Sequence, residues 1–216
     1  MPAIQNIIFD FGNVLFDLDL DSIGRHLRQL SGDRYEQAYR QLQHDKVFEL
    51  YETGGLSTEE FIDAIRHAGQ GTLSAEQIVA VWNSIFIGMP RERFDLLLQL
   101  RQQYQVFLLS NINELHADWI DAYLLREHGI TDFQSRYFDG VYYSHLIRLR
   151  KPEPEIYEYV LADAELNPAQ TLFFDDMDIN VEAARRLGIL GIRHDPKRDI
   201  SEHVWQTLQG QQTGAG

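Results

Sequence analysis

The chain of 216 residues contains no cysteine. Disulfide bonds, a thiolate nucleophile and zinc held by cysteine ligands are therefore excluded. Basic residues are also scarce, since 19 Lys and Arg stand against 33 Asp and Glu and leave a net charge of −14. A nucleic-acid-binding surface needs clustered Lys and Arg to neutralise phosphates, so we expect no nucleic-acid partner.

Long apolar runs are missing as well. No segment reaches the roughly 18 consecutive apolar residues that a membrane span requires. The N-terminal MPAIQNIIFDFG has neither the basic flank nor the apolar stretch of a secretory signal. We therefore expect no membrane partner and a cytoplasmic location, and the sequence leaves the oligomeric state open.

The chain does contain enough apolar residues to fold. Hydrophobic residues make up 44% and aromatic residues 12% of it, which is typical of a globular protein. Short apolar runs separated by helical patterns predict a parallel sheet covered by helices on both faces, so the fold class is α/β. The predicted strands are Ile4 to Phe9, Val106 to Leu109, Gly140 to Tyr143, Thr171 to Phe174 and Ile189 to Arg193.

The stretch from about residue 17 to residue 88 shows helical periodicity and no convincing strand. Two capping boxes mark helix starts, one formed by Ser57 with Glu60 and the other by Ser74 with Gln77. We therefore predict an all-helical insert that acts as a cap. The predicted division is an α/β core of residues 1–16 and 88–216 and a helical cap of residues 17–87.

Polar side chains follow the predicted strands at the points where the strands end. Asp10 follows the first strand and Ser110 the second. Lys151 comes shortly after the third, and Asp175 and Asp176 follow the fourth. Ligands of parallel α/β sheets lie outside the carboxyl ends of the strands, so we expect these side chains to meet. The three carboxylates would repel one another without a cation, and carboxylates with room for water suit Mg²⁺.

A hydroxyl from Ser110 and an ammonium from Lys151 would donate to phosphoryl oxygens beside that metal, which predicts a phosphoryl-transfer site. The segments FDFGNV, SNIN, RKPEP and FFDD, in this order, resemble the four motifs of the haloacid dehalogenase-like superfamily along the whole chain. The helical insert resembles the type 1 cap of that family. The resemblance implies a Rossmann-like core with the strand order 5-4-1-2-3. It also implies a Mg²⁺-dependent phosphohydrolase that acts on a small phosphorylated metabolite, such as a sugar phosphate.

The family's roles transfer to the residues that match its motifs. Asp10 would be the nucleophile and form an aspartyl phosphate, and Lys151 would neutralise charge on Asp10 and on the substrate. Ser110 and Asn111 would hold the phosphoryl group, and Asn180 would orient the acidic loop. The metal ligands implied by the resemblance are Asp10, the main-chain carbonyl of Gly12, Asp176, and Asp175 acting through water or on the metal shell.

The sequence departs from the family at Gly12, where its phosphatases usually carry a second aspartate as general acid and base. The DFGNV string instead resembles a bacterial subgroup with DLGNV that includes an α-glucose-1-phosphate phosphatase. Loss of an acid worth about 10²-fold or more is best tolerated when the leaving group departs easily, as an anomeric hydroxyl, a phosphate or an acyl group does. Asp17, Asp19 and a metal-bound water are the candidate replacements.

Two other functions stay open at this point. A haloacid dehalogenase would use the same attacking aspartate, but that reaction needs no metal, so the adjacent Asp175 and Asp176 argue against it. A non-catalytic phosphate-binding or regulatory protein would keep the fold while Gly12 removes turnover. Each motif alone is also compatible with a structural role, such as capping of the helix that follows the acidic pair.

Overall fold

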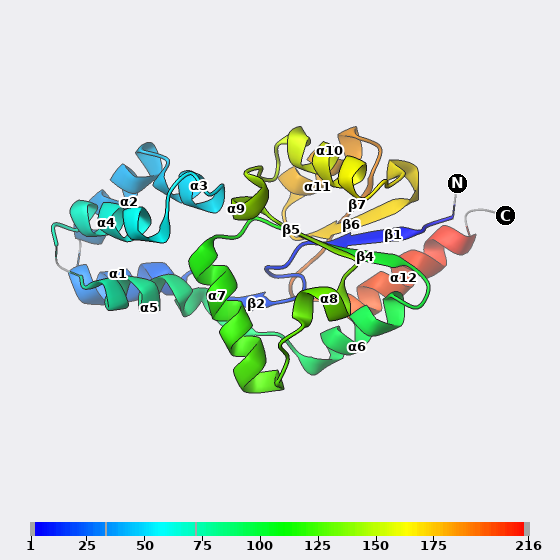
Figure 1. Cartoon of the computed structure of the whole chain (residues 1–216), viewed down its shortest axis with the longest axis horizontal. Coiled ribbons are helices and arrows are strands. Elements are labelled where there is room, and N and C mark those ends of the chain that lie inside the picture. Colours follow the sequence, from blue (N-terminus) through cyan, green and yellow to red (C-terminus); the bar gives the residue numbers. More distant parts are fainter. Residues whose placement is uncertain (1–2, 33, 72, 214–216) are drawn as a thin grey trace.

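The core of the protein is a five-stranded parallel sheet. The computed structural model describes residues 3–32, 34–71 and 73–213. Figure 1 shows the sheet between two layers of helices, with the helical insert projecting from one end. The strands of the sheet are β1 (Asn6–Phe9), β4 (Gln105–Ser110), β5 (Gly140–Tyr143), β6 (Thr171–Asp175) and β7 (Leu190–Arg193).

The order of these strands is β5-β4-β1-β6-β7, and every neighbouring pair is parallel. Numbered along the chain, this is the predicted order 5-4-1-2-3, counted from the opposite edge. The predicted strands and the Rossmann-like α/β class are therefore confirmed. Because β1 lies at the centre, the residue that follows it comes between the ends of two neighbouring strands.

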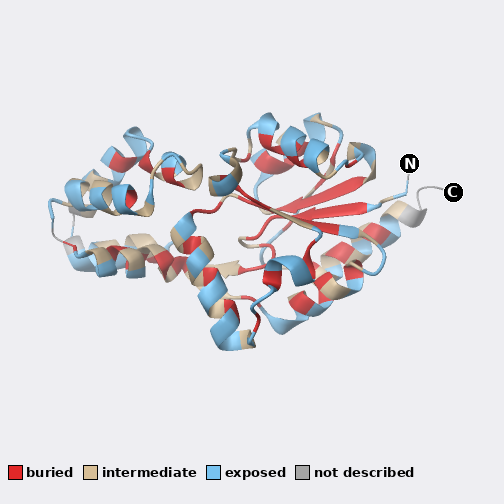
Figure 2. Cartoon of the chain, in the orientation of Figure 1, coloured by how far each residue is buried: buried red, intermediate tan, exposed pale blue. Residues whose placement is uncertain are grey.

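Alternate side chains of β1 enter two separate hydrophobic clusters. Ile7 and Phe9 belong to the cluster that includes residues of α6 (Arg91–Leu100), α8 (Phe133–Tyr137) and α12 (Ile200–Thr213). Ile8 belongs to the cluster that includes residues of α10 (Pro154–Asp163) and α11 (Asp178–Arg186). Figure 2 shows the strands buried under both helix layers. The helices that follow the insert along the chain are α6 (Arg91–Leu100), α7 (Glu114–Tyr123), the π-helical η2 (Leu124–His128), α8 (Phe133–Tyr137), α9 (Ser144–Ile147), α10 (Pro154–Asp163), η3 (Pro168–Gln170), α11 (Asp178–Arg186) and α12 (Ile200–Thr213).

The insert is built from short helices. Both predicted capping boxes are present. The hydroxyls of Ser57 and Ser74 each accept from the main-chain N–H three residues on, and the main-chain N–H of each serine donates to the side chain of that residue. Stacked rings of Tyr51 and Phe61, whose centroids lie 4.0 Å apart, anchor a small core of the insert. The elements of the insert are α1 (Ser22–Ser31), α2 (Arg34–His44), α3 (Val47–Glu52), α4 (Thr58–Ala68), α5 (Ala75–Trp82) and η1 (Asn83–Ile85).

The prediction that this stretch contains no strand is wrong at its two ends. Asp17–Leu18 (β2) and Phe86–Gly88 (β3) form a two-stranded antiparallel ribbon where the chain leaves the core and returns to it. Strands of two and three residues carry no periodicity that a sequence pattern can reveal. The ribbon ties the entry and exit of the insert together, so the insert joins the core through a paired connection.

Among the described residues, no helix is long and apolar enough to cross a membrane.

Candidate active site

The carboxyl ends of three adjacent strands bring the predicted site residues together. Phe9 pairs with Leu108 of β4 and with Phe174 of β6, so the residues that follow these strands meet at one edge of the sheet. Asp10 follows β1, Ser110 is the last residue of β4, and both side chains are buried. The structure thus places the first, second and fourth motifs side by side, as the sequence predicts.

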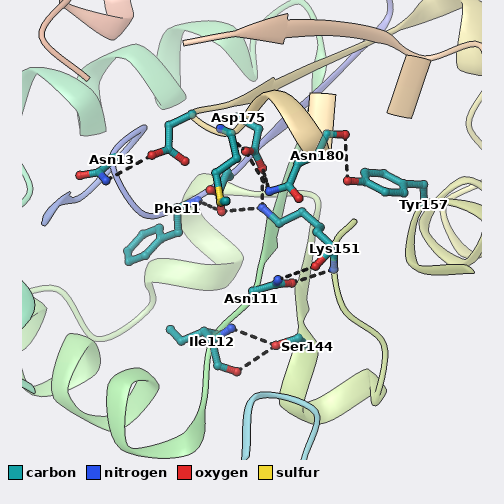
Figure 3. A network of polar contacts seen from close by, with 12 residues as sticks. Phe11, Asn13, Asn111, Ile112, Ser144, Lys151, Tyr157, Asp175 and Asn180 are labelled. Atoms are coloured by element: carbon teal, nitrogen blue, oxygen red, sulfur yellow. Dashed lines mark hydrogen bonds and ion pairs between the residues drawn. The ribbon is translucent and has the colours of Figure 1, made fainter. Parts of the chain in front are cut away.

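One carboxylate oxygen from each of Asp10, Asp175 and Asp176 lies within 4.8 Å of the other two. The ammonium of Lys151 is buried between two of them, 2.7 Å from Oδ1 of Asp10 and 2.7 Å from Oδ2 of Asp175. Figure 3 shows this network around Lys151. Three carboxylates face one ammonium, so the cluster carries excess negative charge in a largely buried site. That composition fits a divalent cation with oxygen ligands.

The pKa values of the cluster reflect this imbalance. Burial raises the pKa of Asp10 to about 7, Lys151 opposes the shift and the charge of Asp175 adds to it. Burial also raises the pKa of Asp176. For Lys151, burial lowers the pKa, but attraction to Asp10 and Asp175 outweighs it and the net pKa is raised. The ammonium therefore stays charged. It does not balance three carboxylates, and a bound cation would supply the missing positive charge.

Asp175 is held rigidly by its neighbours. Its carboxylate accepts from Nδ2 of Asn180, 3.0 Å from each oxygen, from the main-chain N–H of Met177 at 2.8 Å and from Lys151. The hydroxyl of Tyr157 donates to the carbonyl of Asn180 at 3.0 Å. Asn180 orients the acidic loop as predicted, and the contribution of Tyr157 has no signal in the sequence.

Asn13 is a site residue that the sequence analysis missed. Its φ is 57°, a left-handed conformation that asparagine tolerates better than most residues. Its Nδ2 donates to Oδ2 of Asp176 at 3.2 Å, and its Oδ1 accepts from the main-chain N–H of Leu18 at 3.3 Å. One side chain thus connects the loop after Asp10, the acidic loop and the ribbon. The sign of this role in the sequence is no more than an asparagine in the loop that follows Asp10.

The side chain of Asn111 contacts the main chain of Lys151. Its Nδ2 donates to the carbonyl of Lys151 at 2.9 Å, and its Oδ1 accepts from the N–H of the same residue at 2.9 Å. The amide therefore fixes the segment that carries the ammonium. The sequence motif predicts that Asn111 holds the phosphoryl group, and it gives no sign of this contact with Lys151.

Position 12 lies against the ribbon. A Cβ built on Gly12 would be 2.7 Å from Cδ1 of Leu18, so the leucine side chain occupies the space beside this glycine. The two nearby acidic candidates are already paired, Asp17 with Arg93 at 2.7 Å and Asp19 with Arg25. Both of these candidate carboxylates therefore form ion pairs in this structure and do not stand free beside Gly12.

Comparison with known proteins identifies the family. The family model described as haloacid dehalogenase-like hydrolase matches residues 4–188. The D-ribitol-5-phosphate phosphatase of Bacteroides thetaiotaomicron is 30% identical over 187 residues, which cover 86% of this chain and 89% of that protein.

Solved structures agree with this assignment. A haloacid dehalogenase family enzyme from Bacteroides thetaiotaomicron, in complex with magnesium and inorganic phosphate, is 34% identical with a TM-score of 0.83, and the match covers 93% of this chain and 98% of that chain. A haloacid dehalogenase-like hydrolase from Porphyromonas gingivalis is 28% identical with a TM-score of 0.78, covering 96% and 98%. The chain therefore belongs to the haloacid dehalogenase-like hydrolase family.

Proposed function

We propose that this protein is a Mg²⁺-dependent phosphohydrolase that acts on a small phosphorylated metabolite through an aspartyl phosphate on Asp10. The observation that carries the proposal is the buried ammonium of Lys151, 2.7 Å from both Asp10 and Asp175, within a cluster of three carboxylates. The similarity to a phosphatase and to a structure with magnesium and inorganic phosphate supports it.

In this proposal, Asp10 attacks phosphorus and takes the phosphoryl group from the substrate oxygen. Lys151 lowers the pKa of Asp10 against the effect of burial and neutralises charge on the phosphoryl oxygens, while Ser110 and the main-chain N–H of Asn111 donate hydrogen bonds to them. Water then attacks the phosphorus of the aspartyl phosphate, which frees phosphate and restores Asp10.

The cation would be held by Asp10, the carbonyl of Gly12 and Asp176, with Asp175 acting through water or on the metal shell. A bound Mg²⁺ supplies positive charge that offsets repulsion between the carboxylates and the phosphoryl group. Lys151 and Asn180 already fix Asp175, so we assign the more direct contact to Asp176.

We propose that residues 17–87 are a cap over a core formed by residues 1–16 and 88–216. The paired strands β2 and β3 lie at the junction and would act as its hinge. Cap opening would admit the substrate and release the product, as in enzymes whose lids exclude water during the reaction.

A panel of phosphate esters tests the function. We expect hydrolysis of acetyl phosphate and p-nitrophenyl phosphate with Mg²⁺ and loss of activity in chelator. Asp10→Asn would lose at least about 10³-fold in turnover, because the nucleophile is gone. Asp45→Asn, a surface carboxylate of the insert, serves as the matched control.

The same panel separates the alternative functions. It includes sugar 1-phosphates, a pentitol 5-phosphate, hexose 6-phosphates and 2-chloropropionate. Hydrolysis of the haloacid that persists in chelator would instead indicate a dehalogenase. Binding of phosphate without turnover of any ester would indicate a non-catalytic member.

A further inference from the structure

The hydroxyl of Ser144 connects the insert to the segment that carries the phosphoryl donors. Ser144 is the first residue of α9 and is fully buried. Its Oγ accepts from the main-chain N–H of Ile112 at 2.9 Å, and Figure 3 shows this contact. The same Oγ lies 2.6 Å from the carbonyl oxygen of Glu52, the last residue of α3 in the insert. Ile112 ends the stretch of residues 110–112, which we call the donor segment. A single hydroxyl therefore contacts both the insert and the donor segment.

The hydroxyl of Ser144 has one proton and two carbonyl oxygens within reach. The carbonyl of Glu52 lies at 2.6 Å and that of Ile112 at 3.1 Å, so the shorter contact is the one to the insert. The carbonyl of Ile112 also accepts from Nδ1 of His145 at 2.8 Å, and it keeps this donor while Ser144 donates to Glu52. If the insert moves away, the proton of Ser144 can turn to Ile112. Neither position of the insert therefore leaves this buried hydroxyl without an acceptor.

The backbone of the insert lies directly on α9 at this point. Gly54, in the turn after α3, has a φ of 64°, a left-handed conformation that favours glycine. A Cβ built on Gly54 would overlap the carbonyl oxygen of His145. The absence of a side chain at Gly54 therefore lets the insert approach α9 closely enough for the carbonyl of Glu52 to reach Ser144. Two contacts, at Glu52 and at Gly54, thus define one docking point.

The same end of α9 holds the donor segment in place. Ser144 accepts from the N–H of Ile112 and His145 donates to its carbonyl, so the main chain is fixed on both sides of this residue. The residue before it, Asn111, bonds the main chain of Lys151 through both polar atoms of its side-chain amide. The N–H of Asn111 is one of the donors assigned to the phosphoryl group. A shift of Ile112 would therefore move this donor and the segment that carries the ammonium.

We propose that Ser144 is a positioning residue for phosphoryl transfer. Its hydroxyl holds the donor segment in the geometry that the phosphoryl group requires. Docking of Glu52 on the same hydroxyl transmits closure of the insert to that segment. The chemistry stays with Asp10 and with the donors, and Ser144 acts only through their placement. This inference rests on the proposed phosphatase function and on the insert acting as a cap.

Loss of the hydroxyl tests the positioning role. In Ser144→Ala the N–H of Ile112 loses its acceptor, and misplacement of the donors should lower kcat for p-nitrophenyl phosphate about 10- to 100-fold. The affinity for inorganic phosphate, measured by isothermal titration with saturating Mg²⁺, should fall about 10-fold. The affinity for Mg²⁺ itself should stay unchanged, because the hydrogen bonds of Ser144 run to Ile112 and Glu52.

A second buried hydroxyl separates positioning from a purely structural role. Thr171, at the opposite end of β6 from Asp175, is buried and donates to a main-chain carbonyl at 2.8 Å. Thr171→Val should lower the free energy of unfolding in urea and leave kcat unchanged. Unchanged kcat and phosphate affinity in Ser144→Ala would overturn the proposal. Equal losses of kcat in Ser144→Ala and Thr171→Val would overturn it as well, because the effect would then follow from stability.

Gly54→Ala tests the docking point. The added Cβ should push the insert off α9 and lower kcat. In Ser144→Ala the docking bond is already absent, so adding Gly54→Ala to it should lower kcat little further. Gly71→Ala is the matched control, because Gly71 also has a positive φ, 74°, but its Cβ would meet nothing within 4 Å. Losses of kcat that multiply in the double variant would overturn the proposed coupling, since the two residues would then act separately.

The outcomes also separate this inference from the proposed function. Mg²⁺-dependent turnover by the wild type with no loss in Ser144→Ala would reject the positioning role and leave the phosphatase intact. Absence of turnover with every ester would reject the proposed function and this inference with it. Circular dichroism shows whether Ser144→Ala folds. If it does not, the comparison of Gly54→Ala with Gly71→Ala decides.

Discussion

Nδ2 of Asn13 donates a hydrogen bond of 3.2 Å to Oδ2 of Asp176, and so joins the loop after the first strand to the acidic loop. The same side chain accepts from the N–H of Leu18 in the ribbon. The orientation of the proposed metal ligand Asp176 thus depends on a residue that does not itself belong to the carboxylate cluster.

We therefore expect Asn13→Ala to weaken Mg²⁺ binding by about 10- to 100-fold, the usual effect of losing a hydrogen bond that orients a metal ligand. Isothermal titration with Mg²⁺ measures it, with the exposed Asn167→Ala, before the opposite end of β6 from Asp175, as the control. Unchanged Mg²⁺ affinity in Asn13→Ala would show that Asp176 needs no such support.

Removal of the buried ammonium should destabilise the protein. Lys151→Met leaves Asp10 and Asp175 facing each other without a cation, and breaking a buried ion pair costs about 3–5 kcal/mol. Urea unfolding at neutral pH measures the loss, with the exposed Lys197→Met as control. Mg²⁺ should restore part of the stability of Lys151→Met, because it supplies positive charge to the same carboxylates. Failure of Mg²⁺ to stabilise this variant would count against a metal in the cluster.

An aspartate at position 12 should change the dependence on the leaving group. Leu18 fills the space beside Gly12, so the variant to test is Gly12→Asp combined with Leu18→Ala. We expect it to raise kcat for cyclohexyl phosphate by about 10²-fold and to change kcat for phenyl phosphate much less. The matched control is Leu18→Ala alone. Equal effects on both substrates would mean that leaving-group protonation does not limit the native protein.

The stability of the fold should depend on pH through His116. Burial lowers its pKa to about 4, and its ring accepts from Asn113 while Nε2 donates to the carbonyl of Trp82 at 3.1 Å. The folded state therefore favours the neutral ring, whereas the unfolded chain takes up a proton below about pH 6.5. The contribution of the neutral His116 ring to the free energy of unfolding is fully present above this pH and falls as the pH drops towards 4.

Comparison with His116→Gln isolates this effect. Between pH 7.5 and pH 5, the wild type should lose about 2 kcal/mol more free energy of unfolding than the variant, whose side chain cannot take up the proton. Urea unfolding of both proteins at the two pH values measures the difference. An equal pH dependence would show that His116 is charged or accessible in the folded protein.

The parts of the site that follow strand ends could be predicted from the sequence. Asp10, Ser110 and Asp175 come directly after or at the end of apolar runs, and parallel pairing brings those ends to one edge. The capping boxes at Ser57 and Ser74 were visible because their hydrogen bonds join residues three apart.

The rest depends on contacts between residues far apart in the chain. Asn13 meets Asp176 across 163 positions, and Trp82 meets Asn113 across 31, so no local pattern records either contact. The burial of His116 against the insert depends in the same way on how α5 meets α7, which the sequence pattern leaves undetermined.

The proposed chemistry is tested most directly by trapping the covalent intermediate. The enzyme is quenched in acid during turnover of acetyl phosphate with Mg²⁺, reduced with borohydride and mapped by mass spectrometry. We expect a reduced side chain at Asp10 in the wild type and none in Asp10→Asn. Rapid turnover with an unmodified Asp10, or modification at another carboxylate, would contradict it.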